Sequence, residues 1–158
     1  MSRSRLGRAP SGWSGRAGWV ALAAVLLLAT GCGSDSGAVY RDSAVRALEG
    51  TLSEARTAEL AGRLWVAGRS THSFALVVVG DSDTAMGADA AWFEEQQPPR
   101  PGDDLVRRQT TDALDAASSS VQAVRIAVDR RDVRATRTAL EELGSACSDL
   151  ATLAERLS

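Results

Sequence analysis

Nucleophilic catalysis in this chain would have to use His72, because it is the only histidine, together with a thiol or a hydroxyl. Cys147 is the candidate thiol in the body of the chain. It lies between Leu143 and Leu150 in an apolar C-terminal stripe, whereas His72 opens an earlier segment. Nothing in the spacing brings the two side chains together. The sequence therefore predicts a buried, structural thiol at Cys147 and an exposed or capping role for His72.

Metal and haem sites have little support. His72 and Met86 are the only plausible haem ligands, and at fourteen residues apart on one helix they would lie ~21 Å from each other, too far to hold one iron. The aspartate-rich segment 81–89 is faintly similar to a calcium loop. However, Met86 stands where that loop requires glycine, and Trp92 stands where it requires the closing glutamate. We expect no metal and no cofactor.

Acid/base chemistry has no paired carboxylates to use. The adjacent pairs Glu94-Glu95 and Glu141-Glu142 would point about 100° apart on a helix, so neither pair faces one substrate or forms a Glu-x-x-His motif. The sequence also contains no glycine-rich phosphate loop. We therefore expect that the protein is not an enzyme.

The first 31 residues have the pattern of an export signal. Four arginines and no acidic residue precede an apolar run from Trp19 to Ala29. At about 1.5 Å per residue this run spans roughly 16 Å, about half of a hydrocarbon core, which disfavours a permanent transmembrane helix. The sequence Leu28-Ala29-Thr30-Gly31-Cys32 then resembles the lipobox of bacterial lipoproteins.

The lipobox resemblance implies cleavage between Gly31 and Cys32 and acyl chains such as palmitate on Cys32, which would anchor the protein in the membrane. It divides the chain into a signal peptide (1–31), a lipidated cysteine with a polar tether (32–37) and a helical domain (38–158). An uncleaved signal anchor with Cys32 as an ordinary thiol is the alternative. Both interpretations place the body on the extracytoplasmic face of the cell membrane, because the arginines stay inside.

Apolar residues of the body recur in alternating steps of three and four, which is typical of amphipathic helices. The C-terminal stripe comprises Val133, Thr136, Leu140, Leu143, Cys147, Leu150, Ala154 and Leu157. The preceding stripe comprises Thr110, Leu114, Ala117, Val121, Val124 and Val128. The first stripe runs through Val45, Leu48, Leu52 and Ala55 and then slips toward Leu60 and Leu64.

Breaks between the stripes predict four helices, near 38–68, 71–97, 103–129 and 132–157. Gly68 is expected to end the first helix and Ser70 to cap the second, while Asp132 can cap the fourth. The segment 98–103 is the one proline-rich loop. Two alternatives stay open: the β-branched segment 74–79 could be a strand, and 103–157 could be one bent helix.

Similar lengths and short connections predict an all-α fold, an antiparallel up-down-up-down four-helix bundle. The body also looks like the small uncharacterised lipoproteins of high-GC Gram-positive bacteria, from Leu64-Trp-Val-Ala-Gly-Arg-Ser-Thr71 through Gln96-Gln-Pro-Pro99. That resemblance carries over no functional site.

Charge separates along the expected bundle. After residue 31 the chain holds 14 arginines against 20 acidic residues, which argues against nucleic acid as a partner. The turns after the first and third helices should meet at the end far from the membrane. There they would gather a possible cationic tip made of Arg69, Arg130, Arg131 and Arg134. The alternative is that these arginines complement helix C-termini and pair with Asp129 and Asp132.

These observations lead us to expect a non-enzymatic interaction or structural module of the cell envelope, held at the membrane by its lipid anchor. Its partner would be an envelope protein or an anionic wall polymer. The alternative is a sensor-like protein that binds a small ligand between its helices, where the glycines at 50, 62, 80, 87 and 144 could leave a gap lined by Trp65, Phe74 or Trp92.

Overall fold

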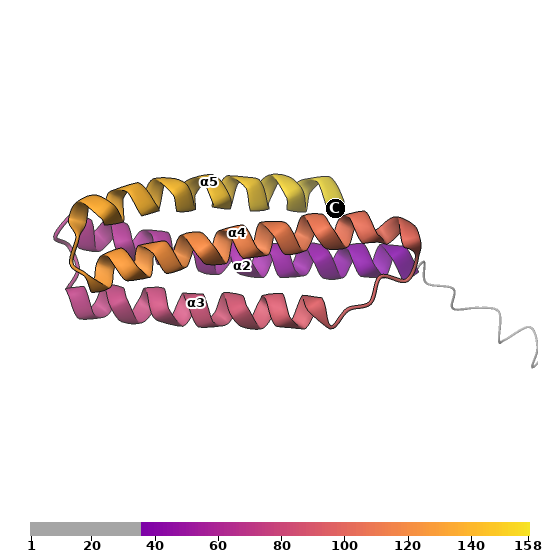
Figure 1. Ribbon diagram of the computed structural model, residues 1–158, viewed down its shortest axis with the longest axis horizontal. Helices are drawn as coiled ribbons and strands as arrows, with labels where there is room; N and C mark the ends of the chain where they lie inside the picture. Colours follow the sequence, from indigo (N-terminus) through magenta and orange to yellow (C-terminus); the bar gives the residue numbers. More distant parts are fainter. Residues whose placement is uncertain (1–35) are drawn as a thin grey trace, which may run out of the picture. The chain divides into compact units, whose positions relative to one another are not determined.

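The computed structural model describes residues 36–158, and this part of the chain is an all-α bundle without a strand (Figure 1). Its elements are α2 (Ser36–Val66), α3 (His72–Glu94), the short 3-10 helix η1 (Pro101–Asp103), α4 (Asp104–Asp129) and α5 (Val133–Leu157). The segment 74–79 is therefore helical, and 103–157 contains two helices rather than one bent helix.

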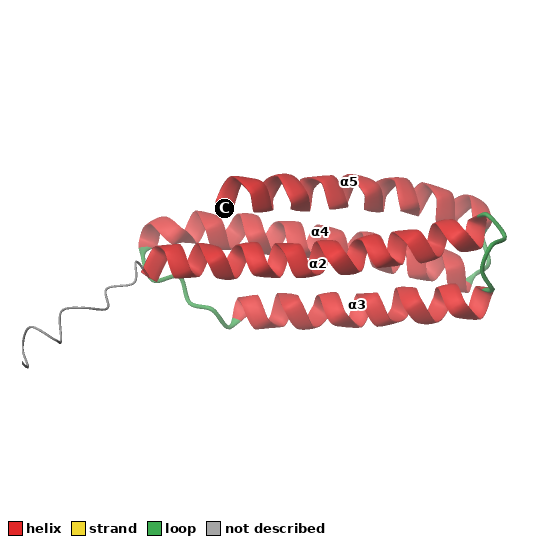
Figure 2. Ribbon diagram, turned by 180° about the vertical axis from the view of Figure 1, so that it is seen from behind, coloured by secondary structure: helices red, strands yellow, loops and turns green. Residues whose placement is uncertain are grey.

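The four helices run alternately up and down, which confirms the predicted antiparallel bundle (Figures 1 and 2). Each helix packs against its neighbours in sequence, and α5 returns to pack against α2. Helices α2 and α4 also touch across one diagonal, while α3 and α5 occupy opposite corners. The cross-section is therefore a flattened rhomb with α2 and α4 on its short diagonal.

Small side chains on α2 allow this diagonal contact. Apart from Tyr40 and Leu48, the buried positions of α2 carry glycine, alanine or threonine. The opposing core of α4 and α5 is built from larger residues such as Leu114, Val121 and Leu143. Large residues that face small ones allow the helices to pack closely. All of this core lies within 40–154, so residues 35–158, which we call the body, have a core of their own.

The predicted stripes of α4 and α5 face the core with one exception. All six predicted positions of α4 are buried, and in α5 burial begins at Thr136. Val133 was expected in the core but is 38% exposed, because it is the first residue of α5 and lies at the end of the bundle. Leu60 is also wrongly predicted: it is 59% exposed, since Ala58 and Ala61 take the core-facing positions around it.

The proline-rich connection makes α3 shorter than expected. A residue before proline avoids helical geometry, so α3 ends at Glu94 instead of near 97. The Arg107 guanidinium of α4 donates hydrogen bonds to the carbonyl oxygens of Glu94 (3.2 Å) and Gln96 (3.4 Å), which are left free at this helix end. We call this end of the body, formed by residues 95–103, the proline end.

Two tight connections form the opposite end, which we call the connection end (Figures 1 and 2). They comprise residues 67–71, between α2 and α3, and residues 130–132, between α4 and α5. Helix α2 starts at the proline end with Ser36, two residues earlier than expected and inside the predicted tether. The chain therefore enters the body at the end opposite to the two tight connections.

Candidate functional site

The predicted lipidation and cleavage sites, Cys32 and Gly31, lie outside the described residues, as does the leader before them. Among residues 36–158, no helix is both long enough and apolar enough to cross a membrane. The candidate site residues that the structure does describe are the four arginines of the cationic tip.

The two tight connections have the same backbone geometry. In the first, Gly68 adopts a left-handed φ of 66°, and the amide nitrogens of Gly68 and Arg69 donate to the carbonyl oxygens of Trp65 and Leu64. This is a Schellman motif, which satisfies the last carbonyl groups of α2. Thr71, rather than the predicted Ser70, then caps α3, because its Oγ1 accepts a hydrogen bond from the Phe74 amide (3.2 Å).

The second connection repeats the motif with an arginine in place of the glycine. Arg131 has a φ of 56°, and the amide nitrogens of Arg131 and Asp132 donate to the carbonyl oxygens of Val128 (2.9 Å) and Ala127 (3.0 Å). Asp132 then caps α5 as predicted, since its Oδ1 accepts from the Ala135 amide at 2.9 Å. A residue with a β-carbon is destabilised by steric contacts in this conformation, whereas glycine is not.

His72 fastens the two connections to each other, a role that the sequence did not suggest. Its ring is half-buried, and Nε2 donates a hydrogen bond to the carbonyl oxygen of Val128 at 2.9 Å. The same ring makes an edge contact with Trp65, with 6.0 Å between the centroids. His72 therefore joins the start of α3 to the end of α2 and the end of α4, which holds the backbone of the cationic tip in one arrangement.

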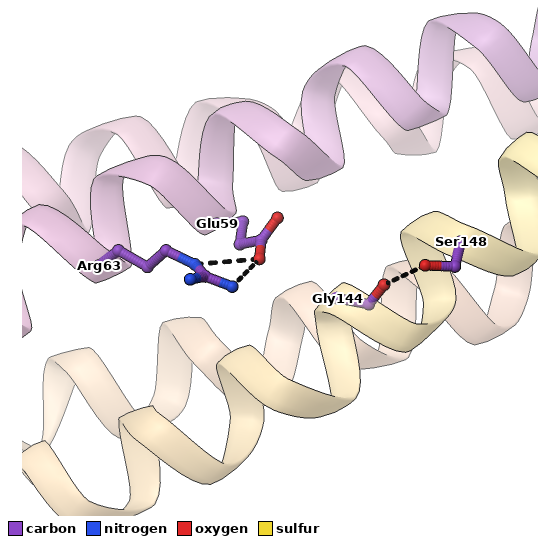
Figure 3. A network of polar contacts seen from close by, with 4 residues as sticks. All are labelled: Glu59, Arg63, Gly144 and Ser148. Atoms are coloured by element: carbon purple, nitrogen blue, oxygen red, sulfur yellow. Dashed lines mark hydrogen bonds and ion pairs between the residues drawn. The ribbon is translucent and has the colours of Figure 1, made fainter.

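All four arginines of the cationic tip are exposed at the connection end. Two other arginines near them are paired: Arg63 donates to Glu59 on its own helix, and Arg125 lies 3.6 Å from Asp83 of α3. Figure 3 shows the first pair, with the Glu59 carboxylate above Gly144 of α5. The tip arginines have no ion pair among the described residues, so the pairs with Asp129 and Asp132 that the alternative interpretation required are absent there, while Arg130 does lie at the C-terminus of α4.

Cys147 lies in the core of α5, as predicted, with 5% of its surface exposed. Burial raises the pKa of its thiol, and the nearby Glu59 carboxylate raises the pKa further against the opposing effect of Arg56. Fourteen residues of α5 separate Cys147 from the connection end, about 21 Å along the axis, so His72 does not reach it. The thiol is therefore placed for packing rather than for attack.

The aspartates of segment 81–89 point in different directions on α3. Asp83 pairs with Arg125, while the Asp89 carboxylate lies against the backbone of Gly50 in α2. Burial raises the pKa of Asp89, and Glu54 adds to this rise. No group of three potential metal ligands lies together among residues 36–158.

Surface hollows flank α4 near the connection end. One hollow, of about 560 Å³, lies between α4 and α5 and is called the α4/α5 hollow; a separate one of about 670 Å³ lies between the same helices nearer the proline end. The α4/α5 hollow is lined by Ala123, Ile126, Ala127, Arg130, Asp132, Arg134, Ala135, Thr138, Ala139 and Glu142. Another, between α3 and α4, also includes Ile126. Sequence reasoning did not single out Ile126 as a surface residue, although its position outside the α4 stripe is a signal that could have done so.

The gaps expected beside five glycines are filled by side chains of facing helices at Gly50 and Gly62, whereas Gly80 and Gly87 meet no atom within 4 Å and Gly80 lines the hollow between α3 and α4. A β-carbon at Gly62 would lie 2.9 Å from Leu140, and one at Gly50 would lie 2.6 Å from Asp89. Trp65, Phe74 and Trp92 line none of the hollows that flank α4. Comparison of the chain with family models, curated proteins and solved structures finds no match.

Proposed function

We propose that the chain is a lipid-anchored, extracytoplasmic lipoprotein of the cell membrane whose helical bundle is a non-enzymatic interaction module of the envelope. The order of the leader supports the anchor: arginines, a short apolar run, small residues and then Cys32. Two acyl chains on one cysteine are enough for stable attachment, whereas one is marginal.

The observation that carries the proposal is the position of the free arginines relative to the point where the chain enters the body. Ser36 begins α2 at the proline end, and the cationic tip lies at the other end. Cys32 precedes Ser36 by four residues, which span at most ~14 Å even when fully extended. An anchor on Cys32 would therefore hold the proline end near the lipid and turn the cationic tip away from it.

Acyl labelling tests the anchor. The full chain is expressed with radiolabelled fatty acid as the wild type, as Cys32→Ser and as the matched control Cys147→Ser. We expect label in the membrane fraction for the wild type and for Cys147→Ser, and none for Cys32→Ser. Equal labelling of all three proteins would contradict the proposal, and so would labelling that depends on Cys147.

The alternative of a small-ligand sensor has weaker support. Ligand sites usually bury most of the ligand in a concave pocket. The hollows beside α4 are open to the surface, and the gaps at Gly50 and Gly62 are occupied by Asp89 and Leu140. A larger partner that covers the surface fits these features better.

A further inference from the structure

The connection end concentrates positive charge in an otherwise acidic body. The segments within two helical turns of the connections, 60–78 and 123–139, contain seven arginines and two aspartates. The rest of the described chain contains seven arginines and seventeen acidic residues. Such a separation produces a positive potential at one end that attracts acidic groups of a partner.

Arginines that are free of internal ion pairs are available to a partner. Arg130 and Arg134 border the α4/α5 hollow, and neither has an ion pair among residues 36–158. Asp132, which lines the same hollow, already accepts a hydrogen bond from the Ala135 amide as the cap of α5. Guanidinium groups favour carboxylate partners because they can donate two parallel hydrogen bonds.

Large apolar side chains are exposed at the same end. Five of the eight exposed large apolar residues fall in the two segments: Leu60, Phe74, Val77, Ile126 and Val133. Ile126 is 48% exposed and lies between the α4/α5 hollow and the hollow between α3 and α4. Four alanines, at 123, 127, 135 and 139, give the α4/α5 hollow a largely apolar surface. Apolar anchors beside arginines are typical of protein interfaces.

We propose that the α4/α5 hollow and the flanking Arg130 and Arg134 form a docking site for a protein segment that carries both apolar and acidic side chains. Apolar side chains of the segment pack on Ile126 and the alanines, and its carboxylates bind the two arginines. Glu142 lines the other end of the hollow and repels a carboxylate there, so the acidic part of the segment lies toward the connection end. This inference deepens the proposed function by naming the partner's chemistry.

Arg131 adds a further exposed arginine beside the docking site. Gly68 occupies the equivalent position of the first connection without strain, whereas the left-handed backbone conformation of Arg131 lowers the stability of the body. An anionic polymer without apolar groups would use the arginines and leave Ile126 in water, which makes it the less favoured partner.

Fluorescence anisotropy of synthetic peptides on the lipid-free body (35–158) tests the docking site. The probe is an amphipathic helical peptide with leucine on one face and glutamate on the other. The comparison probes are the same peptide with glutamine for glutamate, the same peptide with serine for leucine, and polyglutamate. We expect the leucine/glutamate peptide to bind at low ionic strength, the substituted peptides to bind about tenfold more weakly or not at all, and salt to weaken binding.

Matched variants locate the site. Ile126→Ser and the double variant Arg130→Gln, Arg134→Gln should each weaken peptide binding about tenfold. The controls Leu105→Ser and Arg108→Gln, at exposed positions near the other end of α4, should leave it unchanged. Thermal melts establish that each variant is folded, which is expected because all these side chains are exposed.

Three results would overturn the inference. The first is no binding of the leucine/glutamate peptide at millimolar concentration. The second is equal binding of polyglutamate together with insensitivity to Ile126→Ser, which would identify a site for a polyanion instead. The third is equal loss of binding in the control variants. All three leave the acyl labelling of Cys32 unaffected, so failure of this inference is distinguishable from failure of the proposed anchor.

Discussion

Replacing Arg131 with glycine should stabilise the body, because glycine adopts the left-handed conformation without a steric penalty. For other residues this penalty is roughly 1–2 kcal/mol. The greater freedom of glycine in the unfolded chain offsets about 0.4–1 kcal/mol of the gain. The expected net change is therefore about 0.5–1 kcal/mol in favour of the folded body.

The corresponding shift in melting temperature is small but measurable. A body of about 120 residues has an unfolding entropy near 0.25 kcal/mol per degree, so Arg131→Gly should raise Tm by roughly 2–4 °C. Arg131→Ala separates charge from conformation, because it removes the guanidinium and keeps the strain. Its Tm should stay close to that of the wild type.

Gly68 supplies the opposite experiment in the equivalent motif. A β-carbon at Gly68 would meet no atom within 4 Å, so Gly68→Ala adds conformational strain and no clash. It should lower the unfolding free energy by about 1 kcal/mol. The assay is thermal and urea unfolding of the body (35–158) followed by circular dichroism. Equal stability of Arg131→Gly and Arg131→Ala, or no loss in Gly68→Ala, would refute the argument.

Three further predictions concern the middle of the bundle. Gly80→Ala should raise the unfolding free energy by about 0.5–1 kcal/mol in urea titrations, because Gly80 lies inside α3 and a β-carbon there meets open space. Because the pKa of Asp89 is raised in the folded body, its contribution to stability is fully present below the unfolded pKa and is lost as pH rises through the folded pKa. Asp89→Asn should therefore be more stable than the wild type at pH 7, and the difference between their urea midpoints should be smaller near pH 4. Cys147→Ala should cost on the order of 1 kcal/mol, and a bulky maleimide should label the native thiol far more slowly than the urea-unfolded one; rapid native labelling would contradict its buried position.

Periodicity was sufficient to predict the bundle because burial in a helix follows one face. The stripe from Thr110 to Val128 therefore identified six of the seven buried residues of α4 and missed only Ala127. The same rule fails at helix ends, where Val133 keeps the phase of the stripe but has no neighbour above it. It also fails at Leu60, because the alanines around it are less hydrophobic but occupy the face toward the core.

The site was predicted less completely than the fold. Arg69 and Arg130 could be predicted to lie at one end of the bundle, because each is in a short connection and the first and third connections of an up-down fold lie at the same end. The sequence could not show that the backbone of Arg131 has a left-handed conformation, because nothing in a run of charged residues indicates it. It also could not show His72 bonded to Val128 or the hollow beside Ile126, since these depend on how α3, α4 and α5 pack.

The contact between α2 and α5 determines when the body can fold. The first and last helices lie side by side, so one face of α2 has no partner until the C-terminal helix has been synthesised. A ribosome that still holds α5 therefore holds an incomplete bundle, in which the face of α2 that packs on α5 is exposed to water. The contact joins segments about a hundred residues apart, so its loop-closure entropy is larger than that of the contacts between helices adjacent in sequence. Until its final helix has emerged, the chain therefore lacks one of the contacts that complete its core.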